Sequence, residues 1–430
     1  MSLSSRRVAS VSSLVRLALP AAGGVALLLG ASTASAQQWI FDPRVELQGV
    51  YNDNNRLTAE RGQEIEVHGA AIDALAAFRK ESQTNLFEVT PHIRSSWYPD
   101  ASEEESTDYY FDMKGSHKTQ RSVMTIDAGF ADESVVTSDL PVADFPGVDL
   151  GQTASGDSGR VSVRNRRRQY TVQPGYEFDW TERRHLTIDA HYVKTTYDDN
   201  LFEQVGYEDY GATAGIKWNT SQRATFSVNV IGSQFKPDDN SPDTTTGGVF
   251  AEWRMSPTQI LTYYFRAGGN RASHDVVTTI PPAIPGGPTT STSSRESDSS
   301  FNGGAGVAWN YQLTRVLFDL LRSTSPSSQG AIVNRDELRF SFERDFSPLF
   351  TGFLGLRGIH TNGLNSNGAT EVRERKYYTG RTGFDWHISR TYTIEGAYEY
   401  RWQKYQGDPT DASSNGVTLS LIYQPRRLLK

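Results

Sequence analysis

The residues most suggestive of chemistry are one serine and two histidines. Gly156-Asp157-Ser158-Gly159 matches the tetrapeptide around the nucleophile of chymotrypsin-like proteases, but the Gly-Pro that follows it there is missing. The chain also lacks the His and Asp motifs of those proteases. His92 and His191 lie on separate segments with no identifiable serine partner, and no GxSxG, HExxH or phosphate-cradling glycine motif occurs. The sequence therefore predicts a protein that is not an enzyme, with no catalytic, cofactor or metal site; a hydrolase is the least favoured alternative.

The composition excludes further classes. The chain of 430 residues has no cysteine, which removes disulfide scaffolds, thiolate metal sites and cysteine nucleophiles. Its net charge of −7 gives no general attraction to nucleic acid. Only 37% of the residues are hydrophobic, yet 11% are aromatic. This combination fits a chain that shows its apolar side chains on one face only.

The first 36 residues have the three parts of a secretory signal peptide. Several arginines precede an apolar run at Leu17–Gly30, and Ala34-Ser35-Ala36 supplies the small residues of a cleavage site. The apolar run is short for a membrane-spanning helix, which needs about 20 residues. We therefore expect a signal peptide over residues 1–36 and one domain over residues 37–430.

The rest of the chain repeats a unit of two alternating segments joined by a short polar turn. The clearest copies begin at Tyr170, Tyr210, Gly247, Gly303 and Gly380. In the second copy the residues at even positions, from Tyr210 to Trp218, are mostly apolar, while Gly211, Thr213, Gly215 and Lys217 lie between them. Alternation with period two is the pattern of a half-buried strand. The sequence predicts an all-β domain without helices.

The predicted connections alternate in length. Short turns are expected near residues 80–85, 118–121, 181–184, 220–223, 256–259, 312–315, 347–350 and 387–390. Longer loops are expected near residues 52–64, 99–106, 132–165, 198–208, 236–246, 270–298, 323–336, 361–375 and 402–413. This gives a transmembrane antiparallel up-and-down β-barrel of about eighteen strands, with sixteen as the alternative because the first two strands are weak. Short periplasmic turns and long extracellular loops are typical of the outer membrane of Gram-negative bacteria, and both chain ends then fall on the periplasmic side.

Tryptophan positions favour a membrane barrel over a soluble β-propeller. Five of them precede a short turn and predict a periplasmic aromatic girdle: Trp180, Trp218, Trp253, Trp309 and Trp386. The opposite girdle is expected at Tyr51, Trp97, Tyr192, Phe235, Tyr400 and Trp402. A propeller blade needs four strands and buries both faces, whereas these units have two strands and one polar face.

The polar alternate positions would face the interior of such a barrel. The lumen-lining candidates are Arg94, Asp112, Lys114, Glu177, Asp179, Lys217, Glu252, Arg254, Arg266, Arg339, Glu343, Arg381, Asp385, Glu395 and Glu399. Part of this set should form salt bridges across neighbouring strands. Eighteen strands enclose more space than side chains fill, which predicts an aqueous channel for neutral or mildly charged solutes. Tyr110, Phe250 and Tyr264 are expected to offer stacking surfaces for sugar rings, or else to pack under an inward-folded loop.

Charged residues outside the strands suggest lipid partners. Basic residues in the short turns and after the last strand, among them Arg426, Arg427 and Lys430, could meet phospholipid headgroups. Arg164 and the run Arg166–Arg168 could contact lipopolysaccharide phosphates or line a constriction, with a charged rim as the plainer alternative. The expected partners are outer-membrane lipids and lipopolysaccharide, and the oligomeric state stays open.

The chain resembles the outer-membrane β-barrel porin family associated with exopolysaccharide and exosortase-type gene clusters. The matching features are the signal peptide, the segment VTPHIRSSW at Val89–Trp97, the repeated strand–Trp–turn–Arg–strand units and the final strand NGVTLSLIY at Asn415–Tyr423. The resemblance implies an outer-membrane channel that exports a secreted polysaccharide, with polysaccharide-export machinery as a partner. One departure is that Tyr423 is followed by Gln-Pro-Arg-Arg-Leu-Leu-Lys, whereas such barrels usually end in an aromatic residue. The alternatives are a general small-solute porin and a structural or adhesive surface barrel.

Overall fold

The computed structural model describes residues 38–60, 62–139, 165–198, 204–239, 241–280, 290–363, 373–425 and 428–429. The expected signal peptide, the Gly156–Gly159 tetrapeptide, Arg164 and the terminal residues Arg426, Arg427 and Lys430 lie outside these ranges. Among the described residues, no helix is both long and apolar enough to span a membrane.

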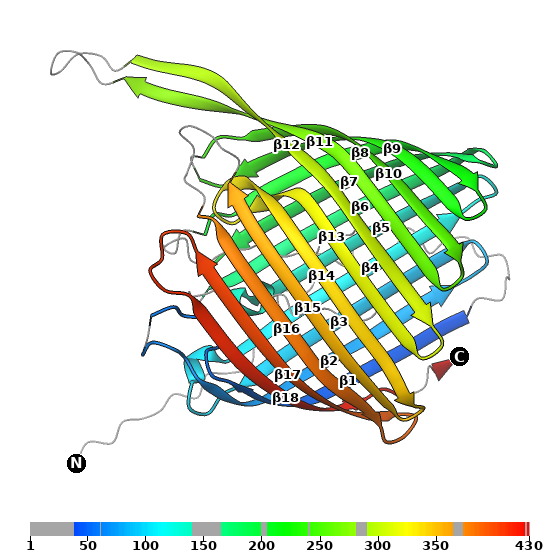
Figure 1. Ribbon diagram of the computed structural model, residues 1–430, viewed down its shortest axis with the longest axis vertical. Helices are drawn as coiled ribbons and strands as arrows, with labels where there is room; N and C mark the ends of the chain where they lie inside the picture. Colours follow the sequence, from blue (N-terminus) through cyan, green and yellow to red (C-terminus); the bar gives the residue numbers. More distant parts are fainter. Residues whose placement is uncertain are drawn as a thin grey trace, which may run out of the picture.

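Eighteen antiparallel strands form a closed barrel (Figure 1). Their bounds are β1 (Gln38–Asn52), β2 (Val67–Glu81), β3 (Asn85–Trp97), β4 (Ser106–Lys118), β5 (Ser122–Ser134), β6 (Arg166–Thr181), β7 (Arg184–Tyr197), β8 (Tyr207–Ser221), β9 (Ala224–Pro237), β10 (Thr244–Thr258), β11 (Leu261–Ile280), β12 (Thr290–Tyr311), β13 (Thr314–Ser327), β14 (Ala331–Ser347), β15 (Phe350–Gly363), β16 (Arg375–His387), β17 (Tyr392–Tyr405) and β18 (Ala412–Tyr423). Each strand pairs with the next, and β1 pairs with β18 from Val45↔Tyr423 to Asn52↔Gly416, which closes the wall. A short β19 (Leu428–Leu429) pairs with Ile40 and Phe41, near the start of β1. The eighteen-strand prediction is confirmed, and the sixteen-strand alternative is wrong.

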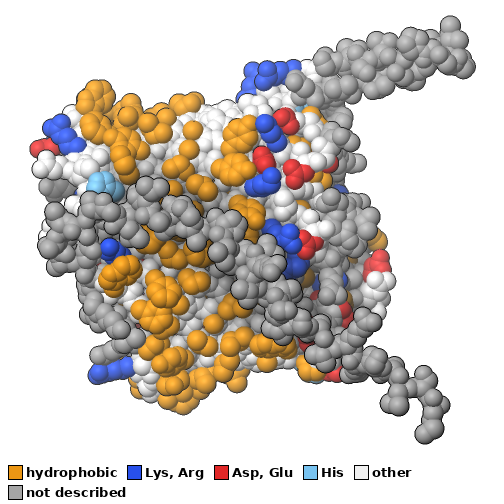
Figure 2. Space-filling view, turned by 180° about the vertical axis from the view of Figure 1, so that it is seen from behind, with side chains coloured by type: hydrophobic (Ala, Val, Ile, Leu, Met, Phe, Trp, Pro, Cys, Tyr) orange, Lys and Arg blue, Asp and Glu red, His pale blue; other side chains and the backbone are white. Residues whose placement is uncertain are grey.

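Side chains alternate between the two faces of the wall. On β10 and β11 the exposed residues Val249, Trp253 and Phe265 lie on the outer face, while Glu252 and Arg266 lie on the inner face. Figure 2, which views the barrel from behind relative to Figure 1, shows hydrophobic side chains spread over the outer surface. Closure gives every strand a hydrogen-bonded neighbour on both sides, and the exposed apolar face then suits hydrocarbon. The protein is therefore an outer-membrane barrel of a Gram-negative bacterium.

All eight predicted short turns are confirmed. They lie between β2–β3, β4–β5, β6–β7, β8–β9, β10–β11, β12–β13, β14–β15 and β16–β17. They gather at one end of the barrel, and the longer connections lie at the other (Figure 1). The start of β1 pairs with the end of β2, and the end of β18 pairs with the start of β17, so β1 begins and β18 ends on the short-turn side.

Two predicted loops are largely strand. The loop expected at residues 270–298 is replaced by extensions of β11 and β12, which stay paired up to Ile280↔Thr290. This segment is rich in Thr and Ser, so no apolar alternation marked it as a strand, although β-branched Thr and Val favour extended backbone. The loop expected at residues 323–336 shrinks to a turn at Ser328–Gly330, where Gly330 has a φ of 75° that glycine adopts without strain.

The prediction of no helix is also wrong at two short places. A 3-10 turn covers Ser102–Glu104, and α1 covers Val135–Asp139. Both are too short to show a helical period in the sequence. The Val-Val-Thr start of α1 favours a strand by propensity, and tertiary contacts decide otherwise, since the Val135 side chain is completely buried.

Candidate functional site

Charged side chains from neighbouring strands meet on the inner wall of the barrel. On β10 and β11, Glu252 accepts hydrogen bonds from Arg266, with Nη2–Oε2 at 2.6 Å, and lies 3.4 Å from Arg254. The Arg266 guanidinium also lies over the ring of Phe250, 5.2 Å from its centroid. Phe250 therefore packs against its own wall. The three charged candidates of these strands form one ion-paired group.

A fully buried group lies beside it. The hydroxyl of Tyr264 donates a hydrogen bond of 2.5 Å to Oδ1 of Asp319, and the guanidinium of Arg339 binds the other oxygen of that carboxylate. Tyr264 has no exposed surface. Its expected role as a stacking surface for sugars is therefore wrong, and its contacts are with wall residues of β13 and β10 and not with an inward-folded loop. Register explains the contact, because Asp319 and Arg339 are directly opposite each other on β13 and β14.

Tyr110 is likewise engaged by the protein. Its hydroxyl donates to Glu133 at 2.9 Å, and its ring stacks on His92 with centroids 4.7 Å apart. His92 in turn contacts Asp73 at 2.9 Å. The ring thus has one face against a neighbouring side chain, which again favours packing over sugar stacking.

The wall from β13 to β17 carries further arginine–carboxylate pairs. Arg357 binds Glu337 at 2.9 Å, and Arg401 binds Glu399 at 2.6 Å. Arg381 pairs with Glu395, and Arg315 pairs with Glu343. Arg401 is expected on the inner face by the same alternation. Arg357 and Glu337 are not in the set predicted to line the lumen, although their positions on the inner alternation indicate it. Paired charges of this kind stabilise the wall and leave little net charge there.

Several other inner-wall candidates have no ion pair among the described residues. Arg94, Asp112 and Lys114 lie on the inner alternation of β3 and β4, and the last two are exposed. Asp385 on β16 also has no ion pair within 4.0 Å in the described part of the chain. Of these groups, the exposed Asp112 and Lys114 are available to a solute. That any of them contacts one stays a prediction.

The β6–β8 wall carries the one group whose donor set could hold a metal ion among the described residues. Donor atoms of Glu177, Asp179 and His185 lie within 4.8 Å of one another. His185 Nδ1 already contacts Asp179 at 2.5 Å, and Lys217 lies 3.5 Å from Glu177. The donor atoms of this group are thus engaged with one another and with Lys217. No serine hydroxyl bonds to a histidine in the described ranges.

Two segments from opposite sides of the barrel meet across its extracellular end. Leu57, in the β1–β2 loop, is buried against Ile359 and Tyr377 of β15 and β16, and Val136 of α1 packs against this cluster. Gln403 fixes the loop by donating a hydrogen bond of 2.9 Å to the carbonyl of Leu57. Because α1 follows β5, nearly opposite β15 in the ring of strands, these contacts bridge the lumen and narrow it.

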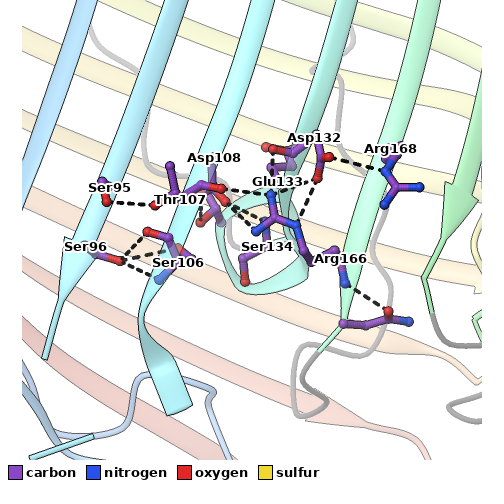
Figure 3. A network of polar contacts seen from close by, with 12 residues as sticks. Ser95, Ser96, Ser106, Thr107, Asp108, Asp132, Glu133, Ser134, Arg166 and Arg168 are labelled. Carbon is purple, nitrogen blue, oxygen red and sulfur yellow. Dashed lines mark hydrogen bonds and ion pairs between the residues drawn. The ribbon is translucent and has the colours of Figure 1, made fainter. Parts of the chain in front are cut away.

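The rim of β4–β6 holds α1 in place (Figure 3). Asp108 is almost fully buried and accepts hydrogen bonds from the Ser134 backbone N–H at 2.9 Å and from the Thr137 hydroxyl at 3.0 Å. Arg166 lies 3.5 Å from Asp108 and binds Asp132 at 2.8 Å. Asp108 thus fixes both the end of β5 and the Thr137 hydroxyl of α1, and the Val135 backbone N–H adds a bond of 3.0 Å to the carbonyl of Asn165.

The basic run at the start of β6 binds acids of the chain itself. Arg167 pairs with Glu133 at 2.6 Å, and Arg168 pairs with Asp132 at 3.3 Å and with Asp198 at 2.8 Å. These pairs favour the charged-rim reading of this run over a lipopolysaccharide contact.

A second inward contact joins the β13–β14 turn to the β7–β8 loop. The backbone N–H of Val205 donates to the carbonyl of Ser328 at 2.7 Å, and Ile332 packs with Tyr207 and Phe235. Phe235 has no exposed surface, so its expected place in the extracellular aromatic girdle is wrong. It lies at an odd position of β9, whereas the exposed residues Phe226 and Val230 lie at even positions.

The other aromatic candidates lie on the outer alternation. Trp180, Trp253, Trp309 and Trp386 are exposed there, and Trp218 stacks on Phe226 with centroids 5.9 Å apart. At the opposite end, Tyr51, Trp97, Tyr192 and Tyr400 are exposed, and Trp402 donates to Asp411 at 2.6 Å. Their function as membrane-interface girdles stays a prediction.

Comparison with known proteins gives distant structural likenesses. No protein-family profile matches the sequence, and no curated protein matches it. Among solved structures, the copper transporter OprC is 10% identical with a TM-score of 0.46; the alignment covers 86% of this chain and 62% of that one. OccK2 (OpdF) of Pseudomonas aeruginosa in complex with glucuronate is 10% identical, TM-score 0.45, with 89% and 98% covered. OccAB4 of Acinetobacter baumannii is 6% identical, TM-score 0.44, with 92% and 99% covered. At these scores the likenesses carry no functional assignment.

Proposed function

We propose that the protein is an outer-membrane channel for small hydrophilic solutes. The observation that carries the proposal is the inner wall, where charged side chains of both signs line a ring of eighteen strands whose outer face is apolar. A barrel of this width encloses more volume than its own side chains occupy, so it retains water. A wet, mixed-charge lumen suits neutral or mildly charged solutes.

The extracellular end favours small solutes over a polymer. α1 and Leu57 bridge the lumen, and the β13–β14 turn reaches the β7–β8 loop. A polysaccharide in transit would have to displace both contacts. Export of a polysaccharide therefore rests on the family resemblance alone, and no contact described above favours it.

Conductance tests the proposal. Purified protein in a planar bilayer should give discrete current steps. A correctly folded barrel that gives no current would contradict the channel. Deleting the gene separates the two transport hypotheses: unchanged exopolysaccharide secretion from a strain whose barrel conducts would contradict export only.

One feature favours a second candidate, a surface barrel that displays a binding arm. β11 and β12 remain paired with each other beyond the ends of their neighbours. β10 pairs with β11 only as far as His274 of β11, and β13 pairs with β12 only from Gly303 of β12 onward. The resulting ribbon projects beyond the barrel (Figure 1). A folded protein without conductance, whose ribbon is needed for adhesion of cells to a surface, would favour this candidate.

A further inference from the structure

The outer wall has a hollow of about 530 Å³ over β12 to β16. Three small residues of its lining lie on the outer alternation, Gly303 and Ala305 of β12 and Gly358 of β15. Phe301 and Tyr378 border the hollow and are exposed by 60% and 52%. Small side chains between large ones thus form a furrow in the wall, on the side of the barrel that faces the viewer in Figure 1.

The furrow opens into lipid, because all of these side chains share the outer alternation with the exposed residues Leu320 and Leu338. Water is excluded at this depth of a bilayer, so the matter that fills an apolar furrow there is hydrocarbon. An acyl chain is long, narrow and flexible, and it fits a furrow that rigid side chains leave open.

Charged side chains cap the furrow at its extracellular end. Arg322, Asp336 and His360 are neighbours on β13, β14 and β15, and they belong to the lining of the same hollow. Lys376 follows on β16, directly opposite His360. This places apolar residues at the depth of acyl chains and charges at the depth of headgroups.

The arginine of this cap, Arg322, has N–H groups without a hydrogen-bond partner among the described residues. Arg322 makes one long ion pair, with Nη1 3.5 Å from Oδ1 of Asp336, and its side chain is 39% exposed. Its Nε is buried without a hydrogen-bond partner, and its Nη2 has none among the described residues. His360 is held by Glu374 at 2.8 Å, and Lys376 lies 3.3 Å from the same carboxylate. A guanidinium with unused N–H groups matches the geometry of a phosphate. By contrast, the arginines at the start of β6 are already ion-paired.

We propose that this furrow binds one molecule of a phosphorylated, acylated glycolipid of the outer leaflet. One acyl chain lies on Gly303, Ala305 and Gly358, and a phosphate accepts hydrogen bonds from Arg322. Asp336 and Glu374 lie beside the cations, so the cap accommodates a single phosphate and not an extended polyanion. The bound lipid lies outside the barrel and is independent of what passes through the lumen.

The test uses the full-length protein in detergent and diphosphoryl hexa-acyl lipid A as the probe, followed by native mass spectrometry. Arg322→Gln removes the phosphate contact, and Ala305→Leu fills the furrow. The matched controls are Arg168→Gln, an exposed arginine of the rim, and Ala212→Leu, on the outer face of β8. We expect Arg322→Gln to lower lipid A retention about tenfold, through the loss of one charge-assisted contact. Ala305→Leu should lower retention by a similar factor because it occupies the place of the acyl chain, and the controls should retain the lipid.

Three outcomes would overturn the proposal. The first is equal retention by Arg322→Gln, Ala305→Leu and the controls. The second is equal binding of dephosphorylated lipid A, which would leave no part for Arg322. The third is a protein that is oligomeric by light scattering and becomes monomeric in Ala305→Leu, since the furrow would then be an interface between copies. Heat-modifiable migration verifies the fold of each variant, and unchanged conductance separates this test from that of the channel.

Discussion

Asp319 is the residue whose loss should weaken the barrel wall most clearly. Its buried carboxylate is shared by the Tyr264 hydroxyl and the Arg339 guanidinium. Asp319→Asn keeps the shape and removes the nearer of two carboxylates beside Arg339, the other being Glu337 at 3.9 Å, so we expect a loss of about 3 kcal/mol in the free energy of unfolding. Tyr264→Phe, which removes one neutral donor, should cost about 1 kcal/mol. Both losses are measured by urea titration of the protein in lipid vesicles, with the folded fraction read from the heat-modifiable gel band. Equal urea midpoints for Asp319→Asn and wild type would contradict the role of Asp319 in the wall.

Glu374 should give a small dependence of stability on acid. His360 and Lys376 donate hydrogen bonds to this carboxyl group and hold its pKa below its usual value. A lowered pKa means that the contact is fully present above the ordinary Glu value of about 4.3 and is lost as the pH falls through the lowered value. Because Glu374 is partly exposed, the effect is at most about 1 kcal/mol.

Comparing Glu374→Gln with wild type tests this sign. The unfolding temperature of the wild type should fall more steeply than that of the variant below pH 4, because only the wild type loses this contact there. A wild type that gains stability relative to the variant as the pH falls below 4 would show that the contact has the opposite sign.

The β11–β12 ribbon is an element that the barrel should not need. Beyond His274 and Gly303 it pairs only with itself. Replacing residues 276–294 by a two-residue Asn-Gly turn joins the paired residues Asp275 and Arg295 and keeps the register. It should leave heat-modifiable migration and conductance unchanged, because no bond of the closed wall is removed. A variant that stays in the unfolded band at room temperature would show that the ribbon takes part in closure.

α1 is the element expected to control current. Asp108→Ala removes the acceptor of the Thr137 hydroxyl and of the Ser134 backbone N–H at the start of α1. The Val135 backbone N–H keeps its bond to Asn165, and Arg166 keeps Asp132. We expect a larger single-channel conductance, of the order of 1.5-fold, since a freed segment no longer bridges the lumen. Thr137→Val should give a smaller increase. The control is Asp132→Ala, because Asp132 binds Arg166 and Arg168 and does not contact α1. An equal increase in conductance in that variant would contradict the role of Asp108.

Sequence alternation predicted the strands and short turns because each depends on local preference and on one membrane-facing side. It also placed Glu252 and Arg266 together, since both lie on inner positions of neighbouring strands. It missed contacts that depend on distant segments: Leu57 with Ile359, and Val205 with Ser328, are joined only when the ring closes. Phe235 is assigned to the extracellular girdle by its distance to the short turn. Its odd position in β9 places its side chain on the inner face of the wall.

At the scale of the whole molecule, the barrel is one hydrogen-bonded ring whose two faces meet different solvents. Ion pairs such as Arg401–Glu399 and Arg381–Glu395 cancel most of the inner charge. What remains is set by groups without an ion pair in the described ranges. On the inner wall of β3 to β7 these include the exposed acids Asp112, Asp127 and Asp189, against Arg94 and Lys114. The lumen should therefore attract cations weakly.

That balance predicts a potassium permeability about twice that of chloride, measured as the reversal potential across a tenfold KCl gradient. Asp112→Asn with Asp189→Asn should bring the ratio to about one or below, whereas Asp198→Asn, outside the lumen, should leave it unchanged. Both effects should fade in 1 M salt, where the Debye length of about 3 Å screens the wall from the ions in its centre. A preference for chloride in the wild type, or a ratio unmoved by the double substitution, would mean that the paired arginines of β14 to β17 and not these aspartates govern the path of the ions.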